Sequence, residues 1–129
     1  MTPATPPTEP IDASVIAGLR ELDDAAGEPL LALLVAAFFG DAPRRTSALA
    51  EALSRGDRDA LRLQAHGLKG SAAALGVVHV VAFAAQLERE AATASLEALG
   101  ATTNQLNEAL AQAEPALRAI SAPAGQRST

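Results

Sequence analysis

One stretch decides the fold: DRDALRLQAHGLKGSAAALG, from Asp57 to Gly76. It opens on an aspartate that can cap a helix, continues through residues of high helix propensity and closes on a glycine. We predict a helix from Asp57 to Leu75 that stops at Gly76. Its buried face is predicted from apolar and small polar residues that recur three or four positions apart, namely Leu61, Gln64, Leu68, Ser71 and Leu75.

Four further helices are predicted on either side of this stretch. We expect them over residues 12–25, 28–55, 77–94 and 95–119. The first carries an apolar stripe at helical spacing, formed by Ile11, Val15, Leu19 and Leu22. The second has room for a bend near residues 40–43, and Pro115 is expected to kink or end the last one. Because short connections between long helices favour antiparallel neighbours, we predict an all-α fold, an antiparallel up-down four-helix bundle with an additional N-terminal helix.

Composition limits both the size and the class of the protein. The chain has 129 residues with 49% hydrophobic and 2% aromatic content, enough for one compact domain, which we place at residues 11–120. Residues 1–10, with four prolines, and residues 121–129 are predicted to be disordered tails. The absence of cysteine excludes disulfides and thiolate chemistry.

Charge and hydropathy exclude several kinds of partner. The net charge of −5 argues against non-specific binding of nucleic acid, which needs a basic surface. The longest apolar run, from Pro29 to Gly40, is shorter than the roughly 20 residues that span a bilayer. We therefore expect a cytoplasmic protein without membrane contact. The only two histidines lie on different predicted helices without cysteines nearby, so no metal site is predicted.

His66 is the candidate for chemistry, because it falls opposite the predicted buried face and must point outward. Arg62, Lys69, Gly70 and Ala73 lie within about 60° of it around the helix. A neutral imidazole is a competent nucleophile near neutral pH, since its unperturbed pKa is about 6.5. Lys69, and Arg62 as a second candidate, can compensate the charge of an incoming phosphoryl group.

Gly70 indicates that something must approach this histidine closely. A glycine inside a helix is less favourable than alanine by about 1 kcal/mol, and the chain uses alanine freely elsewhere. A missing side chain one turn beyond His66 leaves room for a partner's backbone. A low, mildly apolar strip runs beside the histidine and is the predicted docking surface, formed by Leu63, Gly67, Gly70 and Ala74.

The run AHGLKGSAAALG, from Ala65 to Gly76, resembles the signature of the histidine-containing phosphotransfer (HPt) family. The preceding FFGDAPRRTSALAEALSRGDRDALRLQ is similar to the family's approach to that helix. The resemblance implies that His66 accepts the phosphoryl group, that Lys69 assists and that Gly70 leaves room for a receiver domain. It also implies a polar residue on the next helix that hydrogen-bonds the imidazole, either Gln86 or Glu88.

The expected function is that of a phosphoryl carrier in a two-component phosphorelay. It would accept phosphate from a receiver-domain aspartate of a hybrid sensor kinase or response regulator and pass it to another receiver. No glycine-rich nucleotide loop is present, so the chain should have no ATP site of its own. We expect a monomer without cofactors, with Mg²⁺ bound by the receiver. The alternative is a non-catalytic helical adaptor that binds a receiver or kinase without accepting phosphate.

Overall fold

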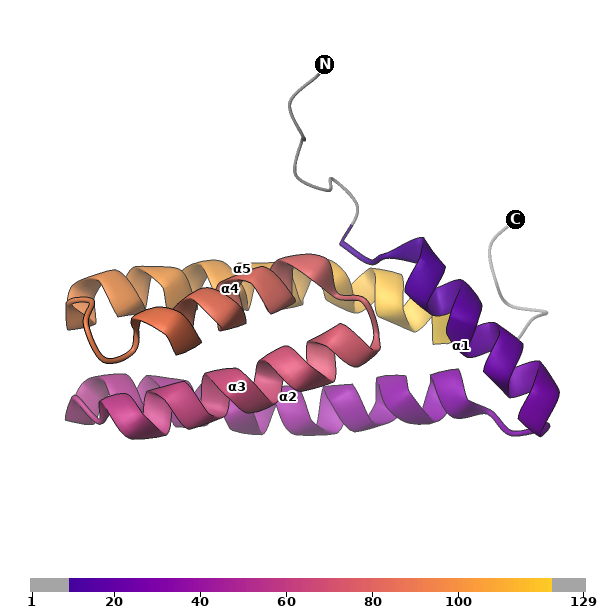
Figure 1. The fold of residues 1–129 in the computed structure, drawn as a ribbon, viewed down its shortest axis with the longest axis horizontal. Coiled ribbons are helices and arrows are strands. Elements are labelled where there is room, and N and C mark those ends of the chain that lie inside the picture. The colour runs from indigo at the N-terminus through magenta and orange to yellow at the C-terminus, as the bar shows by residue number, and fades with distance from the viewer. Residues whose placement is uncertain (1–9, 122–129) are drawn as a thin grey trace, which may run out of the picture.

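The computed structural model describes residues 10–121, which form five helices and no strand (Figure 1). The helices are α1 (Ala13–Ala26), α2 (Leu30–Arg55), α3 (Arg58–Ala74), α4 (Val78–Glu90) and α5 (Leu96–Ser121). The tails predicted at 1–10 and 121–129 lie outside the described residues, except for Pro10 and for Ser121, which ends α5. No helix in the described part of the chain has the length and hydropathy needed to cross a membrane.

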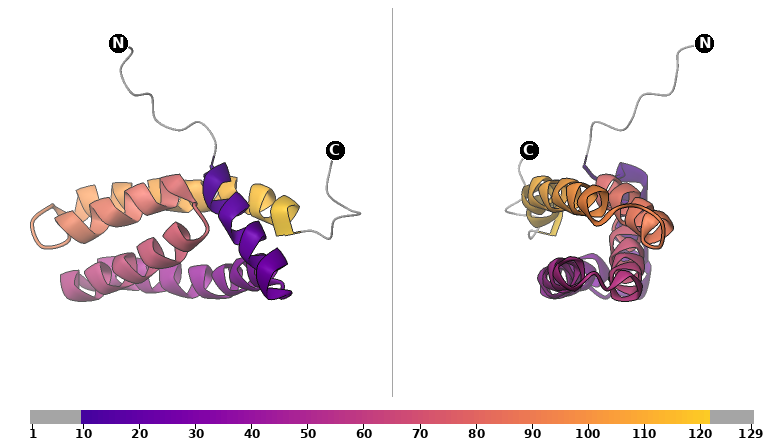
Figure 2. Two further views of the ribbon diagram at one scale, coloured as in Figure 1. Left: turned by 45° about the vertical axis from the view of Figure 1, so that its right-hand side comes forward. Right: turned by 90° about the vertical axis from the view of Figure 1, so that its left-hand side faces the viewer.

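Helices α2 to α5 form the predicted antiparallel bundle. Each packs on the next in chain order, and α5 packs back on α2, which closes the ring of four seen end-on in Figure 2. The additional helix α1 crosses one end of the bundle and packs on α2. Its first turn is tied to the α3–α4 connection, because the Asp12 amide donates to the Gly76 carbonyl at 2.8 Å.

Two glycines set the turns on either side of α3. Gly56 and Gly76 have φ values of 66° and 67°, in the left-handed region that favours glycine. Asp57 follows Gly56 and caps α3, with its carboxylate accepting the Ala60 amide at 3.0 Å. A Cβ on Gly76 would lie 2.9 Å from Cβ of Val15, so this turn also needs glycine to let α1 approach.

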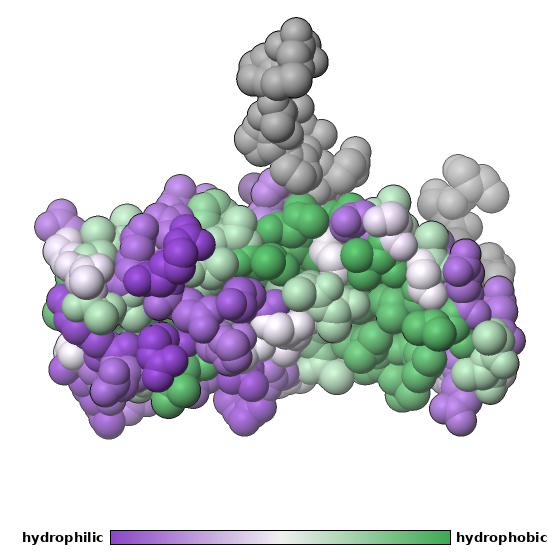
Figure 3. Space-filling model, viewed as in Figure 1, coloured by the Kyte–Doolittle hydropathy of each residue, from purple (hydrophilic) through white to green (hydrophobic). Residues whose placement is uncertain are grey.

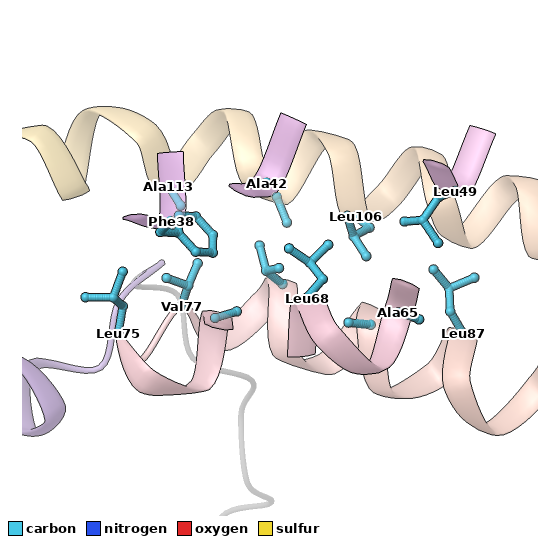
Figure 4. Close-up of a cluster of buried hydrophobic side chains, with 14 of the residues drawn as sticks. Phe38, Ala42, Leu49, Ala65, Leu68, Leu75, Val77, Leu87, Leu106 and Ala113 are labelled. Atoms are coloured by element: carbon cyan, nitrogen blue, oxygen red, sulfur yellow. The ribbon is translucent and has the colours of Figure 1, made fainter. Parts of the chain in front are cut away.

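The buried face of α3 differs in part from the predicted one. Its fully buried residues are Leu61, Ala65, Leu68, Ala72 and Leu75. The three leucines were predicted, but Gln64 and Ser71 lie only half-buried at the edge that faces α2. The face is turned by roughly 40° from the prediction, because the two alanines let α4 pack closely there. Leu68 points into the core cluster that includes Leu87 and Leu106 (Figure 4).

Several helix ends also differ from the prediction. Helix α4 ends at Glu90 rather than near residue 94, and Arg58 donates from Nη1 to the carbonyls of Ala91 and Ala94 in the turn that follows. Helix α5 continues past Pro115 to Ser121, and α2 continues through Pro43. In α1, Ile16 is the buried residue and Leu22 is 54% exposed, so the predicted stripe is wrong at its end.

Candidate functional site

His66 lies midway along α3 with its side chain 65% exposed. Its neighbours Ala65 and Leu68 are fully buried, so the rotation of the helix is fixed by the core and the imidazole must point outward. The ring therefore stands on a convex surface, where a second protein can reach it.

Glu88 on α4 contacts the ring. Its Oε2 lies 2.6 Å from Nδ1 of His66, whereas Gln86 donates to Glu90 at 3.5 Å. Of the two candidates for orienting the imidazole, the structure thus places Glu88 against it. A carboxylate only accepts hydrogen bonds, so Nδ1 carries the proton and the neutral ring keeps its lone pair on Nε2, facing away from α4.

Lys69 shares the same carboxylate. Its Nζ lies 2.5 Å from Oε1 of Glu88, and its side chain is one-third exposed. The Lys69 hydrogen bond, followed by that from His66, lowers the pKa of Glu88 below its ordinary value of 4.5. Glu88 is therefore a carboxylate at neutral pH that holds both the imidazole and the ammonium group within one helical turn of each other.

The predicted docking residues lie at the surface, with one exception. Those that are exposed are Arg62, Leu63, Gly70, Ala73 and Ala74. A Cβ built on Gly70 would meet nothing within 4 Å, so the space beside His66 is open there. Gly67 is the exception, because it is half-buried and a Cβ built on it would overlap the guanidinium group of Arg45.

The α2 side of the site was not predicted from the sequence. Arg45 donates from Nε to Oδ2 of Asp41 at 2.5 Å and from Nη1 to Oε1 of Gln64 at 3.2 Å. Hydrogen bonding to Arg45 lowers the pKa of Asp41, and Arg44 also pairs with this aspartate. The i, i+4 spacing of Asp41 and Arg45 was the available signal for the pair, but it does not indicate contact with α3.

The grooves of the bundle leave His66 outside. One of about 360 Å³ runs between α2 and α3 and includes Phe38, Arg45 and Ala74. Another, of about 380 Å³, lies between α2 and α5. Neither is lined by His66, so the histidine sits beside a groove rather than inside a pocket. Within residues 10–121, no group of three or more His, Cys, Asp or Glu side chains is arranged to hold a metal ion.

The comparisons with known proteins concern the family and the fold of this chain. The family described as "Hpt domain" matches residues 33–116, which include His66 and run from α2 into α5. The crystal structure of histidine-containing phosphotransfer protein B (HptB) from Pseudomonas aeruginosa PAO1 is similar, with a TM-score of 0.78 and 26% sequence identity over 89% of this chain and 96% of that one. The search of curated proteins finds no significant match. Since the family match covers more than half of the sequence, this chain belongs to the Hpt domain family of histidine phosphotransfer proteins.

Proposed function

We propose that this protein is a phosphoryl carrier of a two-component phosphorelay, and that His66 takes phosphate from the aspartyl phosphate of one receiver domain and gives it to the aspartate of another. The observation that carries the proposal is the 2.6 Å contact between Glu88 Oε2 and His66 Nδ1 on an exposed ring. This contact leaves Nε2 as the one ring nitrogen free to attack phosphorus.

The chemistry follows from that arrangement. Nε2 attacks phosphorus, the bond between phosphorus and the aspartyl oxygen breaks, and the donor leaves as a free carboxylate. The phosphorylated imidazole keeps its Nδ1 proton and gains positive charge, which the Glu88 carboxylate stabilises. Transfer to the second receiver reverses these steps, with the P–N bond breaking as an aspartate oxygen attacks.

Lys69 supplies the cation for the incoming phosphoryl oxygens. Its ammonium group lies one turn from His66 on a flexible stem, so it can turn from Glu88 toward the phosphoryl group without a change in the backbone. Phosphoryl transfer depends mostly on positioning and charge compensation, and these residues provide both. Under this proposal Mg²⁺ belongs to the receiver, and the carrier works as a cytoplasmic monomer without nucleotide.

The proposal is tested by incubating the protein with receiver domains charged with radiolabelled acetyl phosphate. We expect acid-labile label on the wild type and none on His66→Gln. His79→Gln is the matched control, since His79 is the only other histidine and lies half-buried on α4, and it should take label like the wild type. Label on His66→Gln would refute the assignment. Receiver binding without label on the wild type would support the adaptor instead.

A further inference from the structure

Gly67 and Arg45 form a feature that phosphate transfer alone does not explain. Gly67 directly follows His66, and the guanidinium group of Arg45 occupies the space that a side chain at position 67 would need. A Cβ there would lie 2.9 Å from Nη2, with two further guanidinium atoms closer still. The absence of a side chain at position 67 is what admits this arginine from α2.

Two of the three guanidinium nitrogens of Arg45 are hydrogen-bonded, and the third is available to a partner. Nε donates to Asp41 and Nη1 to Gln64, while no hydrogen bond from Nη2 is found within residues 10–121. The side chain is 27% exposed. A planar guanidinium fixed at two of its nitrogens loses little conformational freedom when the third binds a carboxylate. Arg45 is thus prepared to receive an acidic group.

Its position puts this donor beside the phosphorylation site. On the α3 wheel Gly67 lies about 100° from His66, on the side opposite Lys69. The imidazole therefore has a lysine on its α4 side and an arginine on its α2 side. Arg44, 76% exposed, adds a second cation on α2, and among the described residues Asp41 is the one carboxylate paired with the two arginines.

The excess of positive charge that Arg44 and Arg45 give to this part of α2 is local. The chain as a whole carries a net charge of −5. On the face shown in Figure 3, hydrophilic residues gather over the half of the bundle that holds the α2–α3 and α4–α5 turns, and apolar residues over the half near α1. A partner that covers His66 would meet a cationic contact at Arg45 and apolar contacts at the exposed Leu63 and Ala74. Because the contact at Arg45 is cationic, charge complementarity favours a partner with acidic side chains at that point.

We propose that Arg45, seated over Gly67, is a docking residue that binds a carboxylate on the surface of the receiver as its phosphoaspartate meets His66. This inference rests on the proposed function and extends the docking surface from α3 onto α2. Arg45 acts on the encounter and not on the reacting atoms. Its loss therefore raises the KM for the phosphorylated receiver and leaves kcat unchanged.

The experiment measures kcat and KM for transfer from a phosphorylated receiver to wild type, Arg45→Ala, Gly67→Ala and the double variant. We expect Arg45→Ala to raise KM about five- to tenfold, less so at high salt. Gly67→Ala should raise it as much, because the new methyl displaces the guanidinium group of Arg45 from its position over residue 67. The double variant should be no worse than either single one. Gly100→Ala, a helical glycine with open space around it, is the matched control and should leave KM unchanged.

A second phosphoryl donor distinguishes a failure of the docking role of Arg45 from a failure of the proposed function. Phosphoramidate needs no docked protein: Nε2 attacks its phosphorus, the P–N bond breaks and ammonia leaves. Its labelling of His66 in Arg45→Ala shows that the nucleophile is intact. A wild-type KM in Arg45→Ala, additive effects in the double variant, or a fall in kcat or in phosphoramidate labelling overturns the docking role while His66 transfer stands. If phosphoramidate labels the wild type but no receiver does, the proposed function and this inference fall together.

Discussion

The two flanks of α3 carry the same kinds of side chain, but these side chains have different roles. On the α4 flank, Glu88 binds both Lys69 and the ring of His66. On the α2 flank, Asp41 binds Arg45, which lies over the backbone beside the histidine. In both places a carboxylate holds a basic side chain. Only the α4 carboxylate touches the imidazole, so only that flank should govern how readily Nε2 reacts, while the other shapes what approaches it.

The largest expected effect on transfer is at Glu88. Replacing Glu88 with Ala removes the hydrogen bond to Nδ1 and frees Lys69, so transfer to His66 should slow about ten- to hundredfold, the range for a lost charged hydrogen bond. Single-turnover labelling by phosphoramidate and by a receiver should both show it. Gln86→Ala is the control, because Gln86 contacts Glu90 and not the ring, and its rate should stay at the wild-type value.

Lys69 offers the next largest effect. Lys69→Ala should slow transfer roughly tenfold by removing the cation that we propose for the phosphoryl oxygens, with the helix content unchanged in circular dichroism. Arg62→Ala removes another cation from the same exposed face, but one without a hydrogen bond to Glu88, and should cost less. Equal losses in the two variants would mean that overall charge, and not the shared carboxylate, is what matters.

Gly67 and Gly70 should differ in how their replacement by alanine changes the stability of the fold. Gly70→Ala should raise the free energy of unfolding by about 0.5–1 kcal/mol, because the added methyl meets nothing within 4 Å and alanine favours the helix. Gly67→Ala should gain less, since it also displaces Arg45 from Gln64 and Asp41. Urea unfolding followed by circular dichroism measures both. An equal gain at both positions would show that the Arg45 contacts contribute nothing to stability.

The smallest expected effect is on the stability of the fold at acidic pH. The pKa values of Glu88 and Asp41 are lowered from their ordinary 4.5 and 3.8 by their basic partners. Each carboxylate therefore stabilises the fold above its ordinary pKa, and this contribution is lost as the pH falls through the lowered value. Glu88→Gln and Asp41→Asn should be less stable than the wild type at pH 6 and approach it below pH 4.5 and 3.8, respectively. Differences that persist to about pH 2 would point to packing instead.

Much of the fold was predictable because it depends on periodicity within single segments. Leu61, Leu68 and Leu75 repeat every seven residues, which fixes one face of α3 and sends His66 outward. The choice between Gln86 and Glu88 was open because it depends on the rotation of α4. That rotation is set by the buried residues Val80, Ala84 and Leu87, and Glu88 lies one turn beyond Ala84 on the same side.

The position of the Arg45 side chain over Gly67 could not be predicted from periodicity. It joins residues 22 positions apart on two helices, and it depends on how far α2 lies from α3 and on the rotamer of a long side chain. Helical periodicity describes which face a residue is on, and not what reaches across to it. The sequence placed Gly67 in the predicted docking strip, but it did not indicate that a side chain from α2 lies over it.

The shared carboxylate of Glu88 has a thermodynamic consequence. In the resting site one anion is balanced by Lys69. When the ring is phosphorylated, it would stay paired with Glu88 while Lys69 turns to the phosphoryl oxygens, so the new positive charge and one of the new negative charges meet counter-charges already present. These counter-charges would lower the free energy of the phosphorylated form. Under the proposed function, phosphoryl transfer would run in either direction, as set by the relative amounts of phosphorylated and unphosphorylated forms of the two receivers.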